Sequence, residues 1–165
     1  MSFFKDLRKL LEQTHFCMAQ QDVRYYLNGL LLEISDKKIR AVATDGHRMA
    51  VTEIGLDKDV KGDKQVIVPR KGVQEMLRLL GDTDDSVELE FGTNHLRART
   101  SEFIFTSKLI DGRYPDYNKV IPGKQSKKLL LGRDLFRETL GRVAILSSEK
   151  YRGVRLSLIS KVLRL

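Results

Sequence analysis

The 165-residue sequence has few of the side chains from which many kinds of site are built. Its single cysteine, Cys17, excludes an internal disulfide and a zinc site made of several thiolates. Tryptophan is absent, and no stretch approaches the ~20 apolar residues that cross a membrane as a helix. The chain also shows no signal-peptide pattern. These features predict a protein of a reducing compartment, the cytoplasm, with no membrane partner.

The composition is that of a folded protein with an excess of positive charge. Hydrophobic residues make up 41% and charged residues 32%, which separates the chain from disordered sequences. The length corresponds to one domain or somewhat more, enough to bury a core without disulfides. The 30 Lys and Arg exceed the 22 Asp and Glu, for a formal net charge of +8. This balance favours anionic partners such as nucleic acid, with solvated surface charge as the alternative.

The chain begins with a helical pattern. The apolar and small residues that repeat at helical spacing are Phe4, Leu7, Leu11, Thr14 and Met18. Basic and polar residues fill the other face, so the segment is either a surface helix on a core or a helix lying on a membrane. The strands that follow immediately favour the surface helix.

Strands and one more helix account for the sequence up to residue 109. Alternating apolar residues predict strands within 28–54, with a tight turn at Asp45-Gly46 between two of them. The later elements that we expect are a strand over 65–68, a helix over about 70–80, a hairpin over 87–99 and a strand over 103–109. One hairpin register satisfies both the charged and the apolar face. It pairs Glu88 with Arg99, Leu89 with Ala98, Glu90 with Arg97 and Phe91 with Leu96.

A second, incomplete copy of the same pattern follows a linker. Residues 110–126 contain two prolines and two glycines and break the pattern. Beyond them we expect a strand over 128–131, a helix over about 133–147 and a strand over 153–159. The inward face of that helix is predicted to carry Phe136, Leu140, Val143 and Ala144.

This repetition predicts an α+β fold of repeated β-α-β-β-β units, with helices on one side and antiparallel sheets on the other. The expected divisions are a domain over 1–122, a linker over 123–126 and an incomplete domain over 127–165. All three expected helices carry a basic polar face, and this recurrence favours a nucleic-acid partner more than any single cluster does.

No catalytic motif is present. The sequence lacks a phosphate-binding glycine loop, a dinucleotide glycine motif and a nucleophile elbow. Its three histidines share no metal-ligand spacing. Asp82, Asp84 and Asp85 cluster in a turn, which leaves a two-metal nuclease site as an alternative. We therefore predict no enzymatic activity, no bound metal and no cofactor.

Two kinds of segment remain as candidate binding elements. Residues 20–27 place an arginine and two tyrosines between a helix and a strand, and such groups stack on bases and contact phosphates. The alternative is that Tyr25 and Tyr26 close the core between helix and sheet. The segments 44–49 and 113–120 mix apolar and polar groups in loops, where binding sites concentrate. Cys17 is expected to pack in the core rather than to react.

Five stretches of the sequence carry a family resemblance. They are MAQQDVRYYLNG (18–29), ATDGHRMAV (43–51), VIVPRKGV (66–73), FIFTSKLIDGRYPDY (103–117) and AILSSEKYRGVRL (144–156). Together they resemble the bacterial sliding clamp family, the beta subunit of DNA polymerase III, over nearly the whole chain. The resemblance implies a DNA-clamp fold whose helices line a pore around duplex DNA. It also implies a non-catalytic role in the processivity of the replicative polymerase.

The resemblance implies two sets of binding residues. Those that would face duplex DNA are Lys9, Gln21, Arg24, Tyr25, Arg70, Lys71 and Arg78. Those that would form a pocket for the short apolar peptide motif of partner proteins are Arg24, Tyr26, Leu27, Thr44, Gly46, His47, Arg48, Met49, Pro115, Lys119 and Val120. The implied partners are the DNA polymerase III catalytic subunit, the clamp loader and other replication and repair proteins.

This sequence departs from the family pattern in two pocket positions and in extent. Met49 stands where leucine is usual, and Lys119 where arginine is common. Family chains have three domains, and two chains form a homodimeric ring through the first and third domains. Here we expect only the middle domain, without its opening strand, and the start of the third. The expected function is that of a sliding clamp; the alternatives are an interaction module that does not encircle DNA and an inactive remnant.

Overall fold

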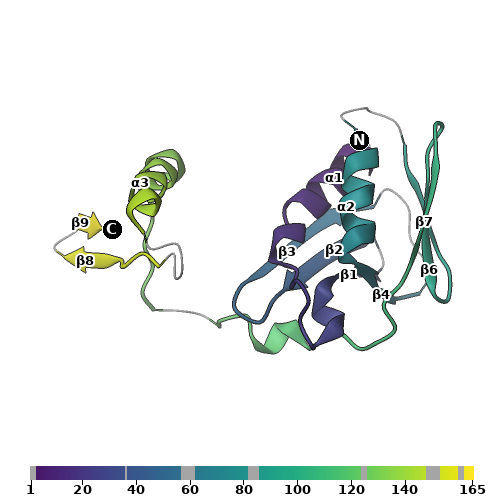
Figure 1. The fold of residues 1–165 in the computed structure, drawn as a ribbon, viewed down its shortest axis with the longest axis horizontal. Coiled ribbons are helices and arrows are strands. Elements are labelled where there is room, and N and C mark those ends of the chain that lie inside the picture. The colour runs from purple at the N-terminus through teal and green to yellow at the C-terminus, as the bar shows by residue number, and fades with distance from the viewer. Residues whose placement is uncertain are drawn as a thin grey trace. The chain divides into compact units, whose positions relative to one another are not determined.

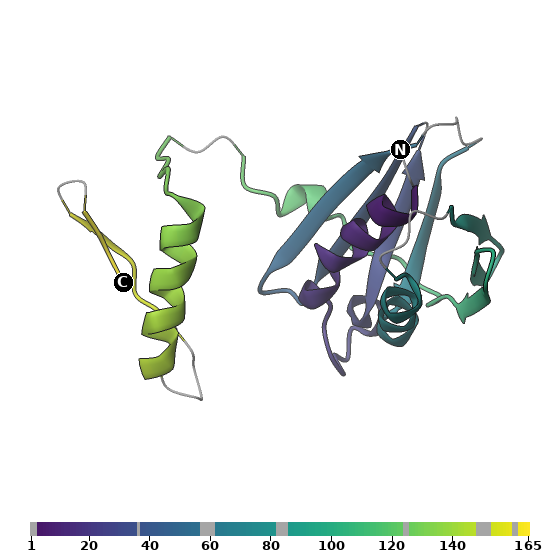
Figure 2. The ribbon, with the colours of Figure 1, turned by 90° about the horizontal axis from the view of Figure 1, so that it is seen from above.

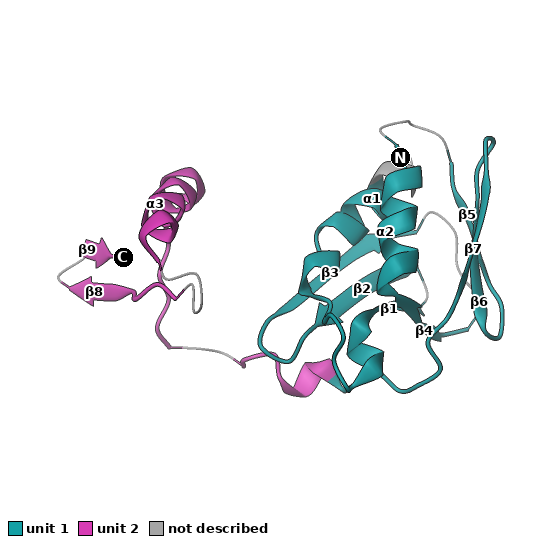
Figure 3. Ribbon diagram, viewed as in Figure 1, with its two compact units in different colours: residues 1–116 teal, residues 117–165 magenta. Residues whose placement is uncertain are grey.

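The computed structural model describes residues 3–35, 37–56, 62–81, 86–123, 126–147, 153–159 and 162–165. It divides into two compact units, Met1–Asp116 and Tyr117–Leu165 (Figure 3). The first unit therefore ends at Asp116, whereas the sequence places the boundary at residue 122.

The first unit is built on a four-stranded antiparallel sheet in the order β3-β2-β1-β4. Its strands are β1 Gly29–Ser35, β2 Lys38–Thr44, β3 Met49–Gly55 and β4 Lys64–Pro69. Side chains alternate between the faces of β1, so Leu30, Leu32 and Ile34 enter the core while Glu33 lies on the other face. The strands predicted within 28–54 and over 65–68 are thus confirmed.

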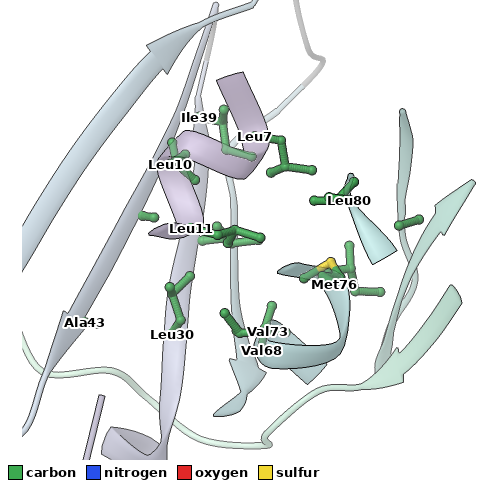
Figure 4. Packing of buried hydrophobic residues seen from close by; sticks show 14 of the residues in the cluster. Leu7, Leu10, Leu11, Leu30, Ile39, Ala43, Val68, Val73, Met76 and Leu80 are labelled. Atoms are coloured by element: carbon green, nitrogen blue, oxygen red, sulfur yellow. The ribbon is translucent and has the colours of Figure 1, made fainter. Parts of the chain in front are cut away.

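Two helices, α1 Phe3–Glu12 and α2 Arg70–Leu79, cover one face of this sheet (Figures 1 and 2). Their apolar stripes meet the strands in one continuous core (Figure 4). Leu7, Leu10 and Leu11 on α1 and Val73 and Met76 on α2 are almost completely buried there. These helices are held by burial of an amphipathic face, since each is only 10 residues long.

The first helix is shorter than the sequence predicts. Apolar periodicity extends to Met18, but α1 ends at Glu12 and a short 3₁₀ turn, η1 His15–Cys17, follows. The Thr14 hydroxyl donates a hydrogen bond to the carbonyl oxygen of Leu10 at 2.8 Å, and such a bond competes with continuation of the helix. Cys17 is buried, as predicted, and this burial raises the pKa of its thiol.

A second, three-stranded sheet completes the first unit. Its strands, in the order β5-β6-β7, are β5 Glu88–Phe91, β6 His95–Arg99 and β7 Ile104–Lys108. All four predicted hairpin pairs, from Glu88 with Arg99 to Phe91 with Leu96, are present. Leu96 and Ala98 extend the core from α2 to this sheet. Beyond β7, Ile110 forms an isolated bridge with Ile67 of β4 and links the two sheets.

The second unit contains the 3₁₀ turn η3 Tyr117–Lys119, the helix α3 Arg133–Leu146, and the short strands β8 Ser157–Ile159 and β9 Val162–Arg164. The helix is confirmed, but the strand predicted over 128–131 is absent. An extended segment becomes a strand only when another strand accepts its backbone hydrogen bonds, and in the described part of this unit β8 pairs only with β9. The strand predicted over 153–159 is likewise reduced to its last three residues.

The inward face predicted for α3 is only partly enclosed. Phe136, Leu140 and Val143 are half-buried, while Ala144 is exposed, so the prediction is wrong for Ala144. No residue of this helix is fully buried among those that the structure describes. The described part of the second unit therefore offers α3 too little apolar surface to bury its stripe.

Candidate functional site

The turn between β2 and β3, residues 44–48, is fixed by its own side chains. The Asp45 carboxylate accepts hydrogen bonds from the backbone amides of His47 and Arg48 at 2.9 and 3.0 Å, and from the Arg48 side chain. The Thr44 hydroxyl donates to the Arg48 carbonyl oxygen and accepts from the Gly46 amide. Gly46 has a φ of +88°, a conformation that favours glycine. His47 and Arg48 are thereby presented to solvent on a defined backbone.

The electrostatics of Asp45 agree with this role. Burial acts to raise the pKa of its carboxyl group, but the hydrogen bonds from His47 and Arg48 outweigh burial and lower it. The carboxylate is therefore charged at neutral pH and holds the turn as an acceptor only.

Arg24 packs over the same turn from the segment that precedes β1. Its guanidinium donates two hydrogen bonds to the Asp22 carboxylate, at 3.0 and 2.8 Å, and a third to the Asp45 carbonyl oxygen at 3.3 Å. A Cβ at Gly46 would lie 3.0 Å from Nη1 of Arg24, so the two segments approach closely. Hydrogen bonds from the Arg24 side chain, and then its backbone amide, lower the pKa of Asp22 to about 2.

The segment after β7 approaches the turn with a buried tyrosine. The backbone amide of Thr44 donates a hydrogen bond to the Tyr114 hydroxyl oxygen at 3.1 Å. Tyr114 is buried, and this burial raises the pKa of its phenol to about 12. A Cβ added at Gly112 would lie 3.2 Å from the Tyr25 ring, so this segment also packs against Tyr25.

The structure brings together the part of the predicted peptide set that lies in the first unit. Arg24, Gly46, His47, Arg48 and Pro115 are exposed, while Tyr26, Thr44 and Met49 are half-buried. Leu27 differs from the rest because only 2% of its surface is exposed, so it supports the site from below. Lys119 and Val120 belong to the second unit and are exposed there.

The predicted DNA-facing residues differ in their exposure and in whether their charged groups already have a partner within the protein. Lys9 on α1 and Lys71 on α2 are exposed and form no ion pair within the described part of the chain. Arg78 pairs with Glu75 at 2.9 Å. Arg70 is half-buried and donates to the Met18 carbonyl oxygen at 3.2 Å. Within this predicted set, the free ammonium groups are thus the two lysines on the helices.

Besides Arg24, described above, the remaining members of that set are Tyr25 and Gln21. Tyr25 is 55% exposed and packs edge-on against Tyr26 with ring centroids 5.7 Å apart. Gln21 is exposed and has a φ of 57°, unusual for a residue other than glycine. It lines a hollow of about 410 Å³ together with His47, Arg48 and Arg70. Members of both predicted sets therefore share one surface.

Sequence reasoning missed Asp22 and Tyr114 as parts of this site. Both lie in the family motifs, QQDVR and GRYPDY. Sequence spacing does not show that Asp22 binds the nearby Arg24, and Thr44, the partner of Tyr114, is 70 residues away. Asp82, Asp84 and Asp85, the alternative metal cluster, lie outside the described residues. Among the residues that the structure does describe, no three His, Cys, Asp or Glu side chains are placed to hold a metal ion. In that same part of the chain no helix has the length and apolarity to cross a membrane.

Two family models match the chain in succession. The model for the central domain of the DNA polymerase III beta subunit matches residues 4–116, and the model for its C-terminal domain matches residues 118–165. The chain belongs to the DNA polymerase III beta subunit family. The family predicted from the sequence motifs is thus confirmed.

Individual relatives and solved structures of this beta subunit family also match the chain. The chain is 53% identical to the beta sliding clamp of Pseudomonas putida over 160 aligned residues. The aligned region covers 96% of this chain and 43% of that relative. A crystal structure of the sliding clamp from Pseudomonas aeruginosa matches with a TM-score of 0.92 at 50% identity, over 97% of the chain and 44% of the clamp. These matches confirm the predicted clamp fold.

A second structure of the Pseudomonas aeruginosa sliding clamp has griselimycin bound. It matches with a TM-score of 0.91 at 49% identity, over 99% of this chain and 44% of that clamp. The chain therefore spans less than half the length of the beta subunits it matches.

Proposed function

We propose that this chain provides part of a sliding clamp, the processivity factor that tethers a bacterial replicative polymerase to duplex DNA. In this role the protein is cytoplasmic and performs no chemistry of its own. Its first unit would supply DNA-facing helices and a docking surface for the DNA polymerase III catalytic subunit, the clamp loader and other replication and repair proteins. Membership of the beta subunit family supports the proposal.

The observation that carries the proposal is the arrangement around the 44–48 turn. Arg24 and Tyr114 hold the turn at two different backbone atoms, and His47 and Arg48 remain exposed on it. A turn held in place by these hydrogen bonds suits the binding of a short apolar peptide, because the protein loses little conformational freedom when the peptide binds. The griselimycin complex of the Pseudomonas aeruginosa clamp supports a ligand-binding surface on this fold.

Contact with DNA would come from the helical face of the first unit. Lys9 on α1 and Lys71 on α2 carry charges that no described acidic group neutralises. Ammonium groups contact phosphates without reading sequence, and such contacts allow a protein to move along the duplex. The formal net charge of +8 is consistent with this function.

The peptide site is tested by titration with a fluorescein-labelled peptide that contains two leucines and a phenylalanine, with unlabelled griselimycin as competitor. We expect saturable binding, competition by griselimycin, and a Kd raised about fivefold or more in His47→Ala. His95→Ala is the matched control, because His95 is an exposed histidine on β6, outside the site. Equal weakening in both variants, or no saturable binding by folded protein, would contradict the docking function.

An Asp substitution at Leu27 is a poor test of the same site. Leu27 is buried, and an unpaired carboxylate there would unfold the surroundings rather than remove a contact. His47→Ala avoids this ambiguity because the side chain is exposed.

Encirclement of DNA is tested separately by topology. A closed ring is retained on circular DNA and lost when the same DNA is linearised. Retention that does not depend on cutting would contradict a ring and favour the interaction module, whereas absence of both DNA and peptide binding would indicate an inactive remnant.

A further inference from the structure

We propose that Tyr114 is a positioning residue for peptide binding: its hydroxyl fixes the 44–48 turn through the Thr44 amide. The proposal rests on the docking function above and adds a residue outside the predicted pocket set. Tyr114 acts through the segment 110–114, called the strap below, which crosses from the end of β7 to the turn.

Thr44 pairs with Met49 of β3 on one side, and the Tyr114 hydroxyl lies on its other side, where β1 offers no partner. The β1–β2 register ends with Leu31 opposite Val42, so no β1 residue pairs with Thr44. An amide left without an acceptor beside a half-buried strand end is costly. The phenol oxygen accepts this hydrogen bond at 3.1 Å and extends the support of β2 up to the first residue of the turn.

The strap is itself anchored at both ends and in the middle. Ile110 donates a backbone hydrogen bond to the Ile67 carbonyl oxygen at 2.9 Å, which ties the strap to β4. Gly112 packs against the Tyr25 ring so closely that a Cβ there would lie 3.2 Å from it. Tyr114, which is only 8% exposed, then accepts the hydrogen bond from the Thr44 amide. Because these anchors restrict the strap, the hydroxyl has a defined place from which to hold the turn.

Arg24 also holds the turn, but it acts on different atoms from Tyr114. Arg24 contacts the Asp45 carbonyl oxygen and lies over Gly46, whereas Tyr114 contacts the amide of Thr44. Removal of the Tyr114 hydroxyl leaves the Arg24 contacts in place. The expected consequence is a looser start of the turn, with His47 and Arg48 less well ordered, rather than loss of the fold.

Tyr114→Phe tests this role because the ring, and therefore its packing, is kept. We expect hydrogen exchange of the Thr44 amide to accelerate at least about tenfold, and the Kd for the labelled leucine- and phenylalanine-containing peptide to rise about three- to tenfold. Thr14→Val is the matched control. It deletes another buried hydroxyl hydrogen bond, 2.8 Å to Leu10, away from the turn. This control should lower the melting temperature without altering Thr44 exchange or the Kd.

The outcomes separate this proposal from the docking function. Unchanged Thr44 exchange in Tyr114→Phe, or faster exchange with an unchanged Kd, overturns the positioning role. A rise in Kd shared equally by Thr14→Val also overturns it, since a general loss of stability would then be the cause. If wild-type protein binds no peptide, the docking function fails and the positioning role for peptide binding is overturned with it. Faster Thr44 exchange in Tyr114→Phe would then show only that the hydroxyl orders the turn.

Discussion

Arg24 and Asp22 form a two-point hydrogen-bonded ion pair beside the 44–48 turn. The Nε and Nη2 atoms of Arg24 donate to the two carboxylate oxygens of Asp22 at 3.0 and 2.8 Å. This geometry is the strong, directional form of the interaction. Arg24 belongs to both predicted sets of binding residues, and a guanidinium already engaged by a carboxylate is better suited to shaping the peptide site than to neutralising a phosphate.

The first prediction concerns the titration of Asp22. Its pKa is lowered from 3.8 to about 2, chiefly by the hydrogen bonds from the Arg24 side chain. A lowered folded-state pKa means that the pair's contribution to stability is present above pH 3.8 and is lost as the pH falls through about 2. Carboxyl NMR should show a midpoint near 2 in the wild type and a clearly higher one in Arg24→Gln. Arg48→Gln is the control, because Arg48 bonds to Asp45 instead; an Asp22 midpoint near 3.8 in the wild type would contradict the pairing.

The second prediction concerns the phenol of Tyr114. Burial raises its pKa from 10.0 to about 12. The neutral phenol is the form favoured by the fold, so this contribution to stability is complete below pH 10 and is lost as the pH rises through about 12. Ultraviolet titration of phenolate should show a late step that Tyr114→Phe removes. A complete titration of all five tyrosines by pH 11 would contradict the buried position.

The third prediction concerns phosphate contacts by the helices. Lys9→Gln and Lys71→Gln should each weaken binding to duplex DNA and reduce the slope of log K against log salt by about 0.9 for each phosphate that the variant no longer neutralises. Lys38→Gln should leave the slope unchanged. Lys38 pairs with Glu53 and shares with Arg40 the sheet face opposite the helices. Equal slopes for all three variants would exclude the helical face as the DNA contact.

The fourth prediction compares two leucines. Leu30 on β1 is fully buried in the core, whereas Leu130 in the second unit is 97% exposed. Leu30→Ala should lower the free energy of unfolding of the first unit by about 2–5 kcal/mol, because it removes buried area and leaves a cavity. Leu130→Ala should change stability by less than about 0.5 kcal/mol. Urea unfolding followed by circular dichroism measures both, and similar effects would contradict the placement of the core.

Local patterns predicted the first unit well where one face of an element is buried. The hairpin register followed from charge and apolar alternation together, since Glu90 opposite Arg97 requires Phe91 opposite Leu96. The same reasoning failed at the end of α1. Apolar spacing continues through Met18 and so predicts a longer helix. It carries no information about a side chain such as Thr14, whose hydroxyl bonds back to the Leu10 carbonyl oxygen near the helix end.

The second unit and the details of the site depended on partners that sequence spacing does not specify. Residues 128–131 have a strand-like composition, but a strand also needs a neighbouring ladder. The mixed apolar and polar residues of 44–49 marked this loop as a candidate binding element, and the family resemblance assigned it to the peptide site. They gave no sign that Tyr114 would reach Thr44, because contacts between residues 70 positions apart depend on the path of the intervening chain.

The location of the peptide site is tested most directly by ¹⁵N NMR of the 165-residue protein during titration with the leucine- and phenylalanine-containing peptide. We predict saturable shift changes concentrated in 24–27, 44–49 and 114–116, with β5 and β6 unaffected. Saturable changes centred on β5 and β6, or no changes in a spectrum of well-folded protein, would contradict a peptide-docking site at the 44–48 turn.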